Sequence, residues 1–157
     1  MTVSPLVTNN FLDSCAFDPK YDPEHSAALE IYKLYEAGRL LLQIAHSTLK
    51  ELEHSNTPGW VKKAAQGLIF TMEVELTEGE RDLLDQIERT LAGNGKLENV
   101  KQDARHVFEA GKYGSYFITA DARILKKALE LSELSNATIV TPSEFLRIAH
   151  RFIEEDT

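Results

Sequence analysis

The sequence has one cysteine, Cys15, and no long hydrophobic run. A single thiol cannot form a disulfide within the chain, and no apolar run approaches the roughly 18 residues of a membrane span. The N-terminal stretch "MTVSPLVTNN" lacks the charged start and long apolar centre of a signal peptide. We therefore expect a cytoplasmic protein. No His–Asp arrangement is anchored to Cys15, so packing is a better explanation of this thiol than nucleophilic catalysis.

Positive charge is also scarce. Seventeen Lys and Arg stand against 25 Asp and Glu, which gives a formal net charge of −8. The overall field of such a protein repels phosphates, so a nucleic-acid role would have to depend on a local site or on a metal ion. The apolar fraction of 43% and the length of 157 residues are typical of one globular domain with a packed core.

Short apolar segments alternate with amphipathic ones along the whole chain, which predicts an α/β fold with a mainly parallel sheet. The segment 69–76, "IFTMEVEL", alternates apolar and polar residues and is expected to be an edge or additional strand. The expected strands are residues 5–12, 40–45, 69–76, 115–119 and 137–141. The expected helices are residues 22–38, 47–58, 77–93, 97–114, 121–134 and 142–155.

Capping residues mark several of the predicted helix ends. Asp22 is the expected N-cap of the first helix, and Thr77 with Glu80 forms a capping-box pattern. Thr141, followed by Pro142, is the expected cap of the last helix.

Four carboxylates are predicted to meet at one edge of the sheet. Asp13 and Asp121 follow strands, and ligands of open α/β sheets bind at the carboxyl ends of strands. Glu51 and Asp103 can reach the same edge from helices. Clustered carboxylates repel one another unless a cation compensates them, and oxygen ligands without cysteine or paired histidine suit Mg²⁺ or Mn²⁺.

Each of these acids also has an ordinary structural explanation. Asp121 is well placed to be a helix N-cap, Glu51 to be a solvated helix residue, and Asp103 to be an early-helix acid favoured by the helix dipole. Asp13 is the hardest to explain structurally, because a strand-end carboxylate has few structural duties. For His46 and His106, partial burial at a helix end is favoured over contact with a substrate phosphate.

Three segments, taken in order, resemble the PIN domain, a nuclease fold found in many ribonucleases and in VapC-type toxins. They are "FLDSCAF", "HSTLKELE" and "KQDARHVFEAGKYGSYFITADARIL". The last is the most telling, because it places an acid on a helix, then an apolar strand, then Thr-x-Asp. The stretch "IFTMEVELTEGERD" departs from compact toxin-type members.

The resemblance implies a single PIN-like domain over residues 1–157, with a three-layer α/β/α architecture. It implies that four acids form the metal-binding set and that the catalytic set consists of these acids and Thr119, the small hydroxyl residue of the Thr-x-Asp block, which fixes the geometry by hydrogen bonding. The implied activity is Mg²⁺- or Mn²⁺-dependent hydrolysis of RNA phosphodiester bonds, leaving a 5′-phosphate, as in a toxin-type nuclease. The four acids are Asp13, Glu51, Asp103 and Asp121.

Binding of an RNA substrate would also need cations, and seven basic residues are candidates for contacts with the RNA backbone. Each of them can equally well be an ordinary solubilising surface residue. Trp60 is a candidate for stacking on a base or for anchoring a loop. As protein partners, the resemblance suggests a second copy in a homodimer and an antitoxin-like protein, and no residue pattern establishes either. The alternative function is a catalytically inactive PIN-like interaction or scaffold module. The seven basic residues are Lys62, Lys63, Arg105, Lys112, Arg123, Lys126 and Lys127.

Overall fold

A three-stranded parallel sheet forms the centre of the computed structural model, which describes residues 3–13, 16, 19–43, 76–113 and 116–155. The strands are β1 (Asn10–Leu12), β2 (Tyr116–Ile118) and β3 (Thr138–Val140), in the order β1-β2-β3. The last residues of the strands are paired in register, Leu12 with Ile118 and Ile118 with Val140. All three carboxyl ends therefore lie at one edge of the sheet, and the predicted α/β class with parallel strands is confirmed.

A short segment extends the sheet beyond β1. Gln43 forms an isolated parallel bridge with Phe11, and its amide and carbonyl bond to the Asn10 carbonyl and the Leu12 amide, both at 2.8 Å. The Asn10 side chain holds this segment by donating to the Leu41 carbonyl at 2.7 Å. The predicted strand 40–45 is thus present as one bridge in its described part. The buried amide also explains why asparagine is tolerated in β1.

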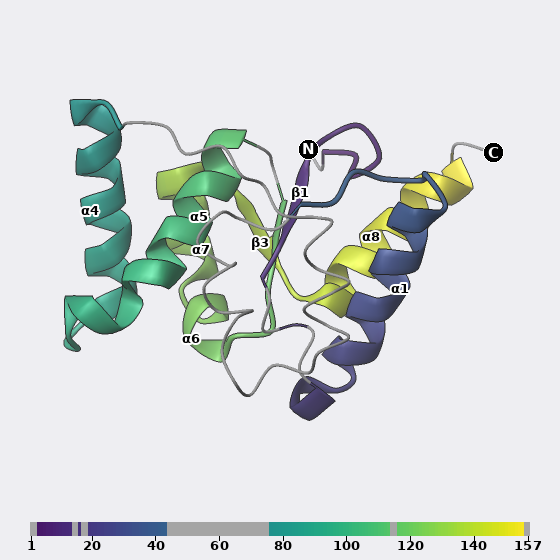
Figure 1. Cartoon of the computed structure of the whole chain (residues 1–157), viewed down its shortest axis with the longest axis horizontal. Coiled ribbons are helices and arrows are strands. Elements are labelled where there is room, and N and C mark those ends of the chain that lie inside the picture. Colours follow the sequence, from purple (N-terminus) through teal and green to yellow (C-terminus); the bar gives the residue numbers. More distant parts are fainter. Residues whose placement is uncertain (1–2, 14–15, 17–18, 44–75, 114–115, 156–157) are drawn as a thin grey trace.

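Helices cover both faces of the sheet (Figure 1). On one face, α1 (Glu24–Glu36) packs against α8 (Pro142–Glu155). On the other face, α4 (Glu78–Ala92), α5 (Lys101–Tyr113) and α7 (Ala128–Ser135) pack together. Short helical turns complete the described fold: η2 (Pro19–Tyr21), η3 (Leu97–Val100) and α6 (Ala122–Leu125). Within the described ranges, no helix combines the length and apolar character needed to cross a membrane.

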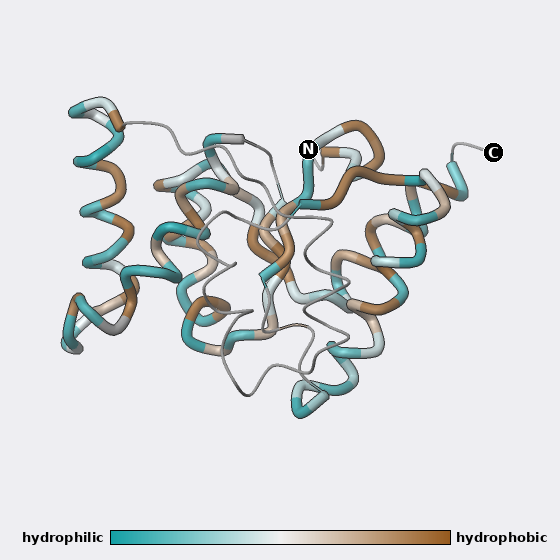
Figure 2. The backbone as a smooth tube through the Cα atoms, viewed as in Figure 1, coloured by the Kyte–Doolittle hydropathy of each residue, from teal (hydrophilic) through white to brown (hydrophobic). Residues whose placement is uncertain are grey.

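Strand side chains alternate between two hydrophobic cores, as the pleat requires. Leu12, Tyr116 and Ile118 pack with residues of α1 and α8. Phe11 and Phe117 point the other way, into the core formed with α4, α5 and α7. Figure 2 shows the strands as mainly hydrophobic, whereas α4 alternates between hydrophilic and hydrophobic stretches along its length. The alternation of side chains along each strand decides which face of the sheet each strand-end residue can reach.

Two of the three capping predictions are confirmed. Thr77 and Glu80 form a reciprocal capping box at the start of α4. The Thr141 hydroxyl accepts a hydrogen bond from the Glu144 amide at 3.1 Å, at the start of α8. The prediction for Asp22 was wrong in position, because Pro23 is the N-cap of α1. The Asp22 carboxylate still accepts a bond from the Ser26 amide at 3.0 Å.

Other predicted boundaries were wrong as well. The strands are shorter than expected, because ladder pairing covers only three residues of each. The expected helix 121–134 is divided at Lys126 and Lys127, where Lys127 leaves helical geometry with a ψ of 12°. Of the predicted strand 69–76, only Leu76 belongs to the described residues, and the predicted helix 47–58 lies outside them.

Helix α5 continues through Gly111 and stops at Tyr113. Gly111 lies against the end of α7. A Cβ atom at this position would come within 2.0 Å of the Ser135 carbonyl oxygen. The close approach of α5 and α7 therefore requires a residue without a side chain at position 111.

We expect Gly111→Ala to lower the free energy of unfolding by about 2–3 kcal/mol, because backbone atoms must move to admit the methyl group. Chemical denaturation monitored by circular dichroism measures the change. Gly79→Ala is the matched control, since a Cβ at Gly79 meets nothing within 4 Å, and it should raise stability by about 0.5 kcal/mol. Equal effects of the two substitutions would contradict the packing described for α5 and α7.

Candidate metal centre

The carboxyl ends of β1 and β2 place Asp13 beside Thr119. Both residues follow the register pair Leu12 and Ile118, and the Asp13 amide donates to the Ile118 carbonyl at 2.9 Å. By alternation, their side chains point to the same face as Phe11 and Phe117, which is the face covered by α5. The Asp13 side chain is directed into the protein, and the residue is only 3% exposed.

The buried Thr119 hydroxyl connects two of the predicted acids. It donates to Asp13 Oδ2 at 2.8 Å and accepts from the Asp121 backbone amide at 3.1 Å. One rotatable hydroxyl therefore fixes both the orientation of the Asp13 carboxylate and the path of the chain into Asp121. The predicted supporting role of Thr119 has a clear geometric basis.

Asp121 caps the short helix α6, as its structural explanation predicted. Its Oδ1 atom accepts from the Arg123 amide at 2.9 Å. Its Oδ2 atom contacts the Arg123 guanidinium at 2.8 Å. Capping leaves the carboxylate at the edge of the sheet, so the structural role of Asp121 is compatible with a role in a site.

Helix α5 contributes Asp103 and His106, which lie one turn apart and face the same edge. His106 Nδ1 lies 4.0 Å from Asp13 Oδ1. The imidazole is fully buried, and its ring centroid is 6.4 Å from that of Phe117. His106 is buried as expected, but fully rather than partly, and it lies in the middle of α5 rather than at a helix end.

Arg123 joins the acid of α5 to the acid of α6. Its Nη2 atom lies 3.0 Å from Asp103 Oδ2 and 2.8 Å from Asp121 Oδ2. The Arg123 side chain is 60% exposed, so the bridge closes the outer side of the cluster. Sequence reasoning offered Arg123 only as a contact for an RNA backbone and missed this ion pair. The spacing of two residues after an N-cap aspartate was a signal for the contact with Asp121, but not for the contact with Asp103.

The two bridged acids respond in opposite ways to this environment. Burial raises the pKa of Asp103 to about 6, and the charges of Asp13 and Asp121 add to this rise, while His106 and Arg123 oppose it. Burial would also raise the pKa of Asp121, but hydrogen bonds from Arg123 and the guanidinium charge outweigh it and leave the pKa lowered. Such a separation of neighbouring carboxylate pKa values is typical of functional sites, although structural ion pairs produce it too.

Four of the five predicted site residues are thus brought to one place. Asp13 and Thr119 are hydrogen bonded through their side chains, and the Asp121 backbone amide donates to the Thr119 hydroxyl. Asp103 faces these residues from α5. Glu51 lies outside the described residues, as do Cys15, His46 and Trp60.

The chemistry of these donors suits a hard divalent cation. In the part of the chain that the structure describes, no group of three or more His, Cys, Asp or Glu residues could by itself hold a metal ion. Mg²⁺ commonly uses only one or two carboxylates and keeps several waters for the rest of its shell. Asp13 and Asp121, linked through Thr119, can provide such a pair.

Of the five predicted cations that the structure describes, three are paired with protein carboxylates: Arg105, Lys112 and Arg123. Arg105 pairs with Glu109 at 2.9 Å, and Lys112 pairs with Glu80 at 2.5 Å. Both lie on α5 and help to fix that helix. Lys62 and Lys63 lie outside the described residues.

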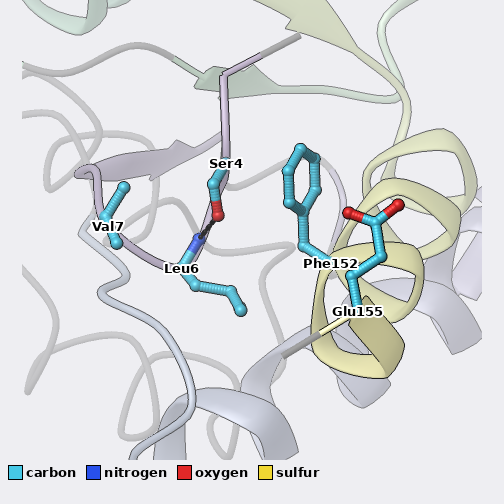
Figure 3. A pocket seen from close by; sticks show the side chains of 5 residues that line it. All are labelled: Ser4, Leu6, Val7, Phe152 and Glu155. Carbon is cyan, nitrogen blue, oxygen red and sulfur yellow. Dashed lines mark hydrogen bonds between the residues drawn. The ribbon is translucent and has the colours of Figure 1, made fainter. Parts of the chain in front are cut away.

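Two cavities lie at opposite edges of the sheet. One of about 200 Å³ is lined by Asp103 and Arg123 and therefore adjoins the acid cluster. The other, of about 250 Å³, lies between the segment before β1 and the end of α8, and contains none of the candidate acids (Figure 3). Figure 3 shows Phe152 and Glu155 of α8 facing Ser4, Leu6 and Val7. Of these two cavities, the one of about 200 Å³ is lined by a candidate acid, Asp103.

No protein-family model matches the chain, and comparisons with curated proteins and with solved structures also found no match. The assignment of a function therefore rests on the residues and on their geometry.

The raised pKa of Asp103 predicts a pH-dependent stability. The folded state holds this proton more tightly than the unfolded state, so ionisation of Asp103 destabilises the fold as pH rises from about 4 through about 6. In metal-free buffer, Asp103→Asn should therefore raise the melting temperature at pH 7.5 and have little effect at pH 3.5.

Asp121→Asn is the matched comparison, because the lowered pKa of Asp121 has the opposite sign. Its ionised form stabilises the fold above pH 4, and that stability is lost as pH falls. The substitution should lower the melting temperature at pH 7.5. Differential scanning fluorimetry across pH 3.5–8 measures both variants, and a shift of the same sign at neutral pH would contradict the described electrostatics.

Proposed function

We propose that this protein is a metal-dependent ribonuclease of the PIN type, which uses Mg²⁺ or Mn²⁺ to hydrolyse phosphodiester bonds of RNA. The observation that carries the proposal is the hydrogen-bonded chain from Asp13 through Thr119 to Asp121 at the carboxyl edge of a parallel sheet. Asp103 faces this chain from α5. The resemblance of the Thr-x-Asp block and of the preceding helix to PIN domains supports the same assignment.

The residues have distinct tasks in this scheme. A divalent ion at the site supplies Lewis acidity for activating water and for stabilising the 3′ oxygen that leaves phosphorus. Asp13 and Asp121 would hold the ion, and Thr119 keeps Asp13 Oδ2 in a fixed direction. Asp103, together with Glu51 if it reaches the same edge, would increase the negative charge that attracts the ion. Water adds to phosphorus, the bond to the 3′ oxygen breaks, and the products are a 5′-phosphate and a 3′-hydroxyl.

One observation favours the second candidate, an inactive PIN-like interaction module. Arg123 already compensates the charges of Asp103 and Asp121, so these acids do not need a metal ion for charge balance. The net charge of −8 also opposes an approach by RNA. The two functions differ in whether a divalent ion binds and whether RNA is cut.

A cleavage assay separates these functions. We expect single-stranded RNA to be cut in Mn²⁺ or Mg²⁺ and left intact in EDTA. Asp13→Asn and Asp121→Asn should each reduce the rate at least about 100-fold, because a lost metal ligand costs more than the 10–100-fold typical of its hydrogen-bond partners. Asp82→Asn, on the exposed side of α4, is the matched control and should cut normally. Cleavage that persists in EDTA or in both site variants would exclude the proposed mechanism.

Metal binding can be measured without any RNA. At 100 times its Kd, an ion bound only to the folded state stabilises it by about 2.7 kcal/mol, or roughly 5–10 °C for a chain of this size. We expect Mn²⁺ to raise the melting temperature of the wild type and of Asp82→Asn by this amount. Asp13→Asn should show little change. A wild-type melting temperature that is insensitive to Mn²⁺ would favour the interaction module.

A further inference from the structure

The cavity beside the acid cluster has two lysines at its margin. Lys96 lies in the turn before η3 and Lys126 follows α6, and both residues are exposed. Across the described residues, neither ammonium group is paired with a carboxylate. Arg123, also in the wall, is held by Asp103 and Asp121. The two lysines are therefore the cations of this cavity that remain available to an anion.

The floor of the same cavity is apolar. Leu91 from the end of α4 and Val100 from η3 line it, and both belong to the core that supports the acid face of the sheet. An apolar floor with a cationic margin suits a ligand that has a flat hydrophobic part and a phosphate. A nucleotide unit has both, since every base presents a π-face and every linkage carries one negative charge.

The size of the cavity restricts the ligand further. About 200 Å³ is less than the roughly 300–1,000 Å³ of pockets that enclose a whole small molecule. It can accommodate one unit of a polymer whose remainder continues outside. Because Asp103 lines both this cavity and the acid cluster, a strand with one unit here would pass the candidate metal centre with an adjacent phosphate.

We propose that the cavity between α4, η3 and α6 binds the nucleotide next to the scissile phosphate of a single-stranded RNA, with its phosphate held by Lys96 and Lys126. This inference rests on the proposed ribonuclease function and adds a substrate-binding subsite to it. In a protein with a net charge of −8, two local cations should account for an unusually large share of RNA affinity. Neither lysine belongs to the catalytic set, so their removal should weaken binding and leave the chemical step intact.

The test uses Lys96→Gln/Lys126→Gln and a control with the same loss of charge, Lys33→Gln/Arg151→Gln. The control residues lie on α1 and α8, on the other face of the sheet, where each forms an exposed ion pair worth little. Binding of a fluorescein-labelled single-stranded RNA is measured by anisotropy in EDTA, where the proposed cleavage cannot proceed. Steady-state cleavage is measured in Mn²⁺.

We expect the pocket variant to bind RNA about tenfold more weakly than the wild type, with a salt dependence reduced by about one unit of slope. Its KM should rise by a similar factor with kcat unchanged, and the control should behave as the wild type in both assays. If the pocket variant loses RNA affinity and the wild type cuts no RNA, the result supports RNA binding in this cavity and rejects the proposed nuclease activity.

Three results with RNA would overturn the proposed binding of RNA in this cavity. They are wild-type affinity in the pocket variant, an equal loss of affinity in the control, and a wild type that binds no RNA. Preferential binding of a phosphoserine peptide over RNA in the same anisotropy assay would also overturn it.

Discussion

The hydrogen bond from Thr119 to Asp13 is the contact on which the rest of the site depends. A carboxylate that is almost completely removed from water is costly unless it is hydrogen bonded, and this hydroxyl provides one bond at 2.8 Å. The same oxygen accepts the Asp121 amide, so the turn after β2 is fixed by the group that orients the acid after β1. Both consequences follow from the parallel register of β1 and β2, because a shift of one residue would turn Asp13 and Thr119 to opposite faces.

The second constraint is charge balance. Three carboxylates share one edge of the sheet, and Arg123 is the cation that the structure places between two of them. Any divalent ion that takes both Asp103 and Asp121 must compete with the guanidinium, whereas an ion held by Asp13 and Asp121 needs to displace it from one acid only. The high pKa of Asp103 indicates that the compensation is incomplete, because burial and the other acids outweigh the arginine. The site therefore retains an attraction for further positive charge.

The position of the acids at one edge of the sheet could be predicted from the sequence, because it depends only on the order of strands and helices and on the alternation of side chains along a strand. Asp13 and Thr119 follow apolar strands, and parallel strands end together, so their convergence requires no knowledge of side-chain packing. Caps such as Thr77 and Thr141 are equally local signals. The break at Lys126 and Lys127 and the pairing of Arg123 with Asp103 were not predicted. They depend on how α6 and α5 lie in space, and Asp103 and Arg123 are separated by 20 positions in sequence with no signal of their proximity.

The arrangement also bears on the apparent conflict between the net charge and the proposed ribonuclease function. A net charge of −8 gives no long-range attraction for RNA, so an active nuclease of this composition must bind its substrate through short-range contacts. Lys96 and Lys126 line the cavity beside Asp103, together with the apolar side chains of Leu91 and Val100. The proposed subsite would favour an unpaired strand, because only an exposed base could occupy the cavity while its phosphate meets the lysines. Paired RNA presents its phosphates without a free base face, and would gain only part of this interaction.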